Sequence, residues 1–198
     1  MDLPLTWKIS RIAGIASVIF YISFLSASWS LAERPYSPLG NWLSDFGNSD
    51  LNPKGAVFYN TGMMLSGLSL FFFVPGFYKW RAKRPGRRMN VILILASGFM
   101  FSFSAIMAGF YSEDYGWLHS FWSAALFTAL GFFLFLSGFL FTHSQKTRPL
   151  AYFGFAAGII DIALGLVFRA PVLEWITVAL AFGYVTLISW QMSRIDLG

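Results

Sequence analysis

Residues 36–53, YSPLGNWLSDFGNSDLNP, form the longest polar interval in an otherwise apolar chain and hold its densest set of turn and cap residues. Ser37 followed by Pro38 is typical of a helix N-cap with proline at the first helical position, where the missing N–H is not needed. Gly47 suits the left-handed residue that ends a short helix. The interval therefore predicts a short interfacial helix over residues 38–46, lying at a membrane surface.

The pair Asn52 and Pro53 repeats this cap-then-proline pattern. It predicts that the next long helix begins there. Asp45 would then lie near the N-terminus of that helix, where negative charge is favoured. The alternative is that Asp45 and Asp50 only cap and solvate a loop.

The composition is that of an integral membrane protein. Of the 198 residues, 57% are hydrophobic and only 12% are charged, whereas a soluble domain carries about a quarter charged residues. The formal net charge of +5 comes from basic residues interleaved with apolar runs, which argues against a nucleic-acid-binding face. Because the chain has no cysteine, disulfides and thiolate metal sites are excluded. We expect one membrane domain over residues 1–198, without a cofactor.

Six apolar runs reach the ~20 residues that a helix needs to cross a bilayer. They predict an all-α polytopic membrane protein with six transmembrane helices. Lys8 and Arg11 precede the first run as in a signal peptide, but the run is too long for one and is interpreted as a span. The runs cover residues 12–32, 55–78, 89–111, 117–142, 150–168 and 173–191.

Basic residues alternate between the two sides of the predicted bundle. They gather at both chain ends and in the second and fourth loops, whereas the other loops are mainly acidic. By the positive-inside rule, the N- and C-termini are predicted to be cytoplasmic and the protein to span the cell membrane. The cluster over residues 79–88 is interpreted as this topology signal, with binding of anionic lipids as the alternative.

The fifth run carries a carboxyl group on a stripe of small residues. Gly154 and Gly158 form a small-xxx-small pattern, and Asp161 and Gly165 fall on the same helical face. A carboxyl on a close-packing face looks into the bundle rather than at lipid. Asp161 is then either a functional ionisable residue or a structural polar group paired with a serine, an asparagine or Arg169.

Helix periodicity predicts that several polar residues meet near the outer surface. Asn60 lies about two turns into the second helix, His119 about one turn into the fourth, and Asp161 in the outer half of the fifth. Together with Ser44 and Asp45, these residues predict an outward-facing polar pocket. Its expected role is to bind or sense a small polar group or a lipid headgroup, and Glu113 and Asp114 could form its rim.

Two other functions remain open. The first is a membrane-embedded hydrolase that uses Asp161 and His119 in acid–base or metal-assisted chemistry on a lipid headgroup. The second is a structural subunit of a larger membrane complex, as a homo-oligomer or beside a partner subunit. No metal site is expected, because His119 and His143 are predicted on opposite sides of the membrane, and the chain carries no known hydrolase or phosphate-binding motif.

One combination of motifs resembles a known family. It consists of LSDFG at residues 43–47, Asn52 with Pro53, FYNTG at residues 58–62, and His119 at the start of the fourth helix. This pattern is similar to that of the prokaryotic, largely archaeal membrane family called domain of unknown function 998. A more distant likeness is to the eukaryotic DRAM and Sfk type of six-span proteins. The resemblance implies the six-span architecture and membrane lipids as partners, without an established enzyme activity.

Overall fold

The structure is a computed structural model that describes residues 5–80, 85–142, 144–167 and 170–192, with the backbone alone for residues 79, 85–87 and 164–167. The chain termini, residues 81–84 of the predicted basic cluster, and His143 lie outside the described residues. The α-helices are α1 (Leu5–Ser30), α2 (Ala56–Phe73), α3 (Pro85–Phe110), α4 (Trp117–Gly138), α5 (Arg148–Val167) and α6 (Pro171–Gln191). Short 3-10 helices are η1 (Ser44–Gly47), η2 (Val74–Trp80), η3 (Glu113–Tyr115) and η4 (Phe139–Phe141).

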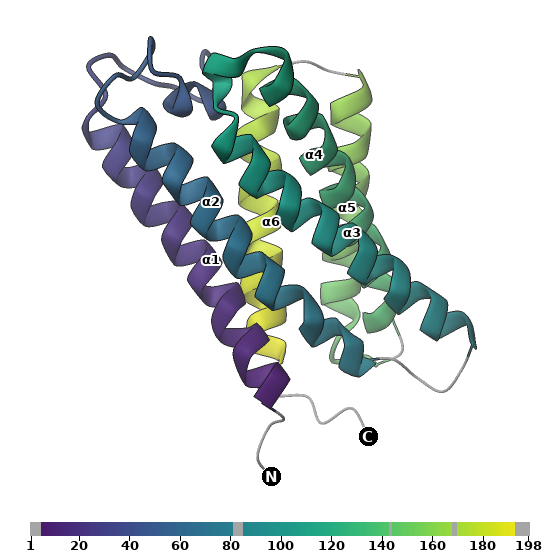
Figure 1. Cartoon of the computed structure of the whole chain (residues 1–198). Coiled ribbons are helices and arrows are strands. Elements are labelled where there is room, and N and C mark those ends of the chain that lie inside the picture. Colours follow the sequence, from purple (N-terminus) through teal and green to yellow (C-terminus); the bar gives the residue numbers. More distant parts are fainter. Residues whose placement is uncertain (1–4, 81–84, 143, 168–169, 193–198) are drawn as a thin grey trace.

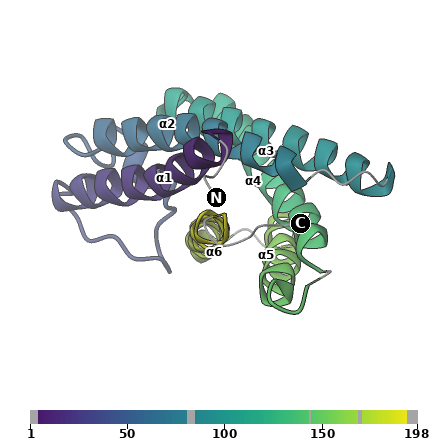
Figure 2. The same cartoon turned by 90° about the horizontal axis from the view of Figure 1, so that it is seen from below.

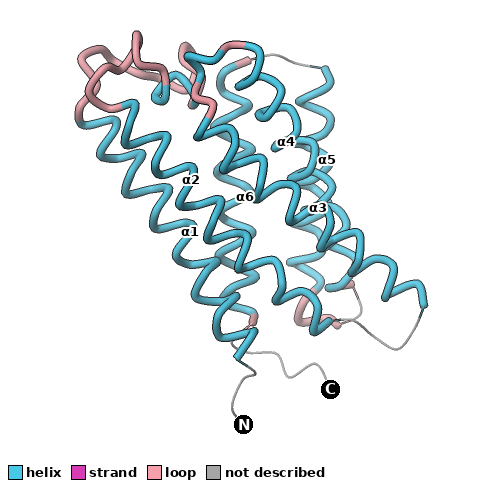
Figure 3. Tube along the Cα trace, viewed as in Figure 1, coloured by secondary structure: helices cyan, strands magenta, loops and turns pink. Residues whose placement is uncertain are grey.

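Successive helices are neighbours in a bundle. α1 packs on α2, α2 on α3, α3 on α4 and α4 on α5, while α6 packs against both α1 and α5 (Figure 1). Seen from below, α1 to α4 form a curved layer, and α6 lies on its concave side with α5 beside it (Figure 2). The long loop that carries η1 lies at one end of the bundle, opposite the end where α1 begins and α6 ends (Figure 3). We call it the η1 end.

The described helices have the length and composition of membrane spans. Five segments are long and apolar enough to cross a membrane, with mean hydropathy of 1.5 to 2.2: Leu5–Ser30, Ala56–Tyr78, Arg88–Phe110, Trp117–Phe141 and Pro171–Gln191. Large side chains such as Ile19, Val57 and Phe110 are exposed on the outside of the bundle, where lipid is the favourable surrounding. The chain is an all-α, multi-pass membrane protein.

The short helix in the first long loop begins later than the sequence predicts. Ser37 caps only a turn, in which its carbonyl accepts the N–H groups of Gly40 and Asn41 at 3.1 and 2.9 Å. The helical segment, η1, covers Ser44–Gly47. Gly47, the last residue of η1, is not in the predicted left-handed conformation. Among the described residues, only Gly116 has a positive φ. Glycine is required at 47 for space, since a Cβ there would meet the side chain of Asn60.

The second predicted cap is also different. α2 begins at Ala56 after Gly55, without a side-chain cap. Asn52 is instead buried, and its Nδ2 donates to Ser28 Oγ at 2.9 Å and to the Phe46 carbonyl at 3.1 Å. The residue therefore ties the end of α1 to η1 and to the start of α2, which is a long-range role that a local cap pattern does not reveal.

An aromatic cluster fixes η1 on the bundle. Phe46 is fully buried, and its ring stacks on Tyr36 with centroids 4.2 Å apart. It also packs on Tyr59 of α2 and on Trp175 of α6, at 6.2 and 6.1 Å. Burial of one phenylalanine contributes about 1.5–3 kcal/mol. The cluster therefore holds the first loop down between α2 and α6.

Candidate functional site

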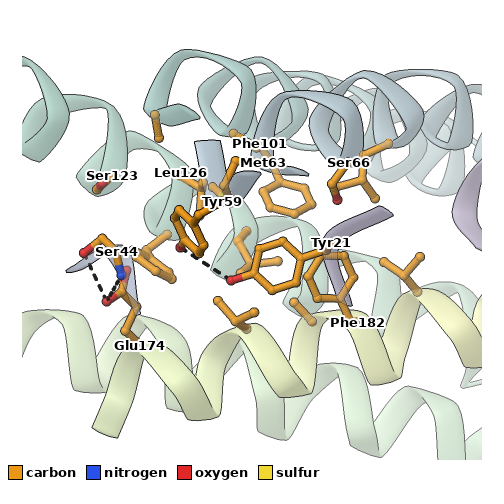
Figure 4. Close-up of a pocket in the computed structure, with 18 of the residues that line it drawn as sticks. Tyr21, Ser44, Tyr59, Met63, Ser66, Phe101, Ser123, Leu126, Glu174 and Phe182 are labelled. Carbon is orange, nitrogen blue, oxygen red and sulfur yellow. Dashed lines mark hydrogen bonds between the residues drawn. The ribbon is translucent and has the colours of Figure 1, made fainter. Parts of the chain in front are cut away.

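A cavity lies beneath η1 between α1, α2, α3, α4 and α6. Its volume is about 50 Å³, several times the ~10–15 Å³ that one water needs on the same measure. Most of the wall is aliphatic or aromatic, and polar atoms are few (Figure 4). The polar lining residues are Ser44, His119, Ser123 and Glu174 toward η1, followed by Tyr21, Tyr59 and Ser66.

Glu174 joins the cavity wall to η1. It lies in the first turn of α6, which begins at Pro171, and its Oε2 accepts the N–H of Leu43 at 2.7 Å, the N–H of Ser44 at 3.3 Å and the Ser44 hydroxyl at 3.4 Å. These donors are at the start of η1, so the carboxyl group of one helix caps a short helix 130 residues earlier in the chain. Charge-assisted hydrogen bonds of this kind are stronger than neutral ones.

His119 is held by two hydrogen bonds that define its tautomer. Its Nδ1 is 2.9 Å from the carbonyl of Tyr111, at the end of α3. A carbonyl only accepts, so Nδ1 carries a proton, and in the neutral imidazole Nε2 is then the acceptor. Nε2 lies 3.1 Å from the hydroxyl of Ser123, one turn along α4. The arrangement leaves Ser123 as donor to an imidazole whose ring orientation is fixed.

Deeper in the cavity, three hydroxyl groups interrupt the apolar wall. The hydroxyl oxygens of Tyr21 and Tyr59 are 3.5 Å apart. Ser66 is 2% exposed, and its Oγ has no hydrogen-bond partner within the described part of the chain. An unpaired buried hydroxyl costs free energy. Among the described residues, Ser66 is therefore an unpaired polar group at this level of the bundle.

Two of the predicted site residues lie just above the cavity rather than in its wall. Asp45 is 7% exposed, and its Oδ2 accepts Asn41 Nδ2 at 3.3 Å and the N–H of Trp42 at 3.1 Å. The side chain of Asn60 donates to the Gly47 carbonyl at 2.9 Å. Both residues therefore shape the loop over the cavity, and Asp45 is a loop cap. Ser44 and His119 are the predicted residues that line the cavity.

Asp161 lies apart from this group. It is 3% exposed and faces α4, where a Cβ added to Gly131 would be 2.8 Å from its Oδ2. The predicted direction into the bundle is thus correct, but Asp161 does not line the cavity. Neither carboxyl oxygen has a hydrogen-bond partner among the described residues, and the predicted pairing with Arg169 lies outside them. Asp161 faces Gly131 of α4, and no described residue of α5 lines the cavity.

The family model described as "Protein of unknown function (DUF998)" matches residues 14–192. The chain belongs to this family. The match includes every residue that lines the cavity, from Tyr21 to Val185. No curated protein and no solved structure matches the chain. The archaeal bias and the likeness to DRAM and Sfk proteins stay predictions.

For this DUF998 protein, the sequence prediction of the site missed Glu174, Ser123 and Ser66. Periodicity does not identify Glu174, because its partners Leu43 and Ser44 are too distant in sequence to be paired with it. An available signal was the acidic residue in the first turn after a proline, a position favoured for negative charge. Within the described residues, no group of three or more histidine or carboxyl side chains is placed to hold a metal ion.

The predicted rim residues connect two loops at the η1 end. Asp114 Oδ1 accepts the N–H and the hydroxyl of Ser49 at 2.9 and 3.0 Å, and Oδ2 accepts the hydroxyl of Ser112 at 2.8 Å. Partial burial acts to raise the pKa of Asp114, but the hydrogen bonds from Ser112 and Ser49 together lower it below its ordinary value. Burial raises the pKa of Glu113, and the negative charge of Asp45 raises it further.

Replacement of Glu113 by glutamine is expected to change the pH dependence of stability. With a raised folded-state pKa, the contribution of Glu113 is fully present below the ordinary glutamate pKa and is lost as pH rises through the raised value. Glu113→Gln should therefore have a higher Tm than the wild type at about pH 8 and a similar one at about pH 4. Asp114→Asn is the control with the opposite expected change in Tm. The lowered pKa of Asp114 contributes stability above the ordinary aspartate pKa, so Asp114→Asn should have a lower Tm than the wild type at about pH 8. Equal pH profiles for Glu113→Gln and wild type would contradict the expectation.

Replacement of Asp161 by asparagine is expected to leave the fold intact. The carboxyl group has no hydrogen-bond partner among the described residues, so the isosteric amide loses none and avoids burying an ionisable group. The Tm of Asp161→Asn in detergent should equal or exceed that of the wild type. A folded Asp161→Asn protein that has lost its cellular function would instead establish a functional role for the carboxyl group.

Proposed function

We propose that this protein binds an amphipathic small molecule, with a lipid headgroup or similar polar group at Ser44, His119 and Glu174 and an apolar body in the cavity. The observation that carries the proposal is the placement of a polar end on an otherwise apolar cavity. Ligand sites are commonly apolar with a few convergent polar groups. Membrane lipids are the proposed partners.

The proposal includes a topology. α5 is 20 residues long, which reaches the span length, and we propose it as the sixth transmembrane helix. The alternation of basic residues supports cytoplasmic termini, and we therefore propose that the η1 end faces outward from the cell membrane. Because the chain has no cysteine, single cysteines test this directly. Leu39→Cys, at 82% exposure, should react with an impermeant maleimide in intact cells, and Gln145→Cys should not. The reverse pattern would overturn the orientation.

Binding is tested by filling the cavity. Native mass spectrometry of the protein extracted from membranes should detect a bound molecule of lipid mass. Ala105→Phe places a ring in the cavity wall on α3 and should abolish that species. Ile92→Phe, on the exposed face of the same helix, is the matched control and should retain it. A wild-type protein that carries no such molecule and takes up none from lipid vesicles would overturn the proposal.

The hydrolase alternative is favoured by one specific contact, the hydrogen bond from Ser123 to His119 Nε2. Its chemistry would use Ser123 rather than Asp161 beside His119. Ser123 Oγ would attack an ester carbonyl carbon while its proton passes to Nε2, and the leaving alkoxide would take that proton as an alcohol. Water would then hydrolyse the acyl-serine. A fluorophosphonate should label the wild type and not Ser123→Ala, and absence of labelling would exclude this reaction.

The structural-subunit alternative gives a different result in the same experiments. A protein that acts only through assembly would carry no cavity ligand and no fluorophosphonate label. It would be extracted by a mild detergent as a homo-oligomer or with a partner membrane subunit.

A further inference from the structure

The polar end of the cavity has carboxyl groups and, among the described residues that line it, no lysine or arginine side chain. Glu174 lies in the cavity wall. Two more carboxyl side chains lie at this end of the bundle, Asp45 in η1 and Glu113 in η3, and η1 contacts η3. An anionic headgroup at this end would therefore meet like charges at close range in a poorly solvated place, which is unfavourable.

The basic side chains of the η1 end are directed elsewhere. Lys54 forms an exposed ion pair with Glu33 at 2.7 Å. Arg34 donates from Nε to the Leu51 carbonyl at 3.0 Å, and its guanidinium lies 5.8 Å from the Tyr36 ring centroid. Neither residue lines the cavity. The described cations at this end therefore do not offset the charge of Glu174.

The second carboxylate oxygen of Glu174 remains available. All three hydrogen bonds that Glu174 accepts from the described residues go to Oε2. Oε1 can thus bind a ligand donor while Oε2 holds η1. Figure 4 shows the Glu174 side chain at one end of the cavity, with the ring of Tyr59 between it and the ring of Tyr21.

Aromatic rings favour the same kind of ligand. Tyr59, Tyr21 and Phe182 all line the cavity, and the Tyr21 ring lies 6.1 Å from that of Tyr59 and 4.8 Å from that of Phe182. The faces of aromatic rings attract ammonium groups. A carboxylate next to several aromatic rings is therefore suited to a cationic amine.

The dimensions of the cavity favour one hydrocarbon chain. On α2 its wall runs from Tyr59 to Leu70, a distance of about 16 Å at the helical rise. This is about half of the ~30 Å hydrocarbon core, the depth of one leaflet. A volume of about 50 Å³ over that length describes a narrow cavity, which has room for one chain and not for two.

From these contacts we infer that, if the proposed function holds, the ligand is a single-chain amphiphile with a cationic amine head. Its ammonium group lies at Oε1 of Glu174, beside the ring of Tyr59. Its hydrocarbon chain runs along α2 toward Leu70.

The test compares three probes with the same chain: dodecylamine, dodecanol and dodecanoate. Each is titrated into the delipidated full-length protein in a non-ionic detergent, and binding is followed by native mass spectrometry and by the shift in Tm. Dodecylamine should bind about tenfold more tightly than dodecanoate, the effect expected for one charge-assisted hydrogen bond.

Two variants assign that preference to the cavity. Glu174→Gln should remove most of the preference for the amine, whereas Asp50→Asn, an exposed charge change in the same loop, should leave it unchanged. Because Glu174→Gln also alters the contact with η1, Tyr59→Leu, which removes the ring proposed to lie beside the ammonium group, is the second variant. It should weaken binding of dodecylamine while dodecanol binds as before.

The outcomes separate the two proposals. Equal binding of all three probes, or a preference for dodecanoate, would overturn the amine inference and leave the proposed function standing. A preference for dodecanol would likewise overturn it in favour of an uncharged head. If no probe binds and no lipid is extracted with the protein, the proposed function itself fails.

Discussion

Replacement of Gly158 by alanine is expected to lower the free energy of unfolding by about 3 kcal/mol, near the upper end for overpacking. A Cβ at this position would lie 2.7 Å from the Phe135 nitrogen and 2.8 Å from the Gly131 carbonyl oxygen. Both are backbone atoms of α4, so no side chain can move aside to relieve the clash. α5 would have to separate from α4, which also loosens the contact that buries Asp161.

Gly183→Ala is the matched control for this prediction. Gly183 also lies inside a helix, α6, but a Cβ there would meet only the far end of the Phe153 ring, at 3.7 Å. Alanine favours the helix over glycine by about 1 kcal/mol, so Gly183→Ala should be neutral or stabilising. Unfolding in mixed micelles, followed by tryptophan fluorescence, measures both variants. If Gly158→Ala were as stable as Gly183→Ala, the close packing of α4 and α5 would be wrong.

Replacement of Glu174 by alanine is expected to have the second large effect. It removes the acceptor of the Leu43 and Ser44 N–H groups, which are left without a partner under η1. A lost hydrogen bond to a charged group and an unpaired donor together should cost about 3 kcal/mol. Limited proteolysis should also cut within residues 36–53 faster than in the wild type, because η1 is released from α6.

Two other carboxyl substitutions serve as controls for Glu174→Ala. Glu174→Gln keeps an oxygen acceptor for Leu43 and should lose less than half as much stability. Glu33→Ala removes an exposed ion pair with Lys54 at the same end, and exposed pairs contribute little, so it should cause no measurable change. A Glu174→Ala protein with wild-type stability and wild-type proteolysis would show that α6 does not hold η1.

The helices were predictable because the chemistry of a membrane span is local. A run of about 20 apolar residues needs no knowledge of its neighbours to indicate a helix, and the described helices coincide with the predicted runs to within a few residues at most ends. The helical face shared by Gly154, Gly158 and Asp161 was also predictable, because close packing of helices requires small residues at regular spacing. The prediction that Asp161 faces the bundle is confirmed.

The composition of the site was not predictable in the same way. Periodicity places Asp161 on the inner face of α5, but it does not say that this face is covered by Gly131 of α4 instead of opening to the cavity. The pairing of Glu174 with Leu43 and Ser44 depends on how α6 is rotated and where η1 begins. The rotation of α6 and the start of η1 are both determined by packing among all the helices. A local sequence pattern does not contain this information.

For the ligand binding proposed above, the hydrogen bonds between Glu174 and η1 have a consequence for how long a ligand would stay in the cavity. Ser44 belongs both to the cavity wall and to the segment that Glu174 holds. A molecule that leaves through the η1 end must first break the hydrogen bonds from Leu43 and Ser44 to that carboxyl group, so its escape is limited by the opening of η1. Exchange through this end is then expected to be slow even for a weak ligand. Variants that release η1 should shorten the residence time more than they change the affinity.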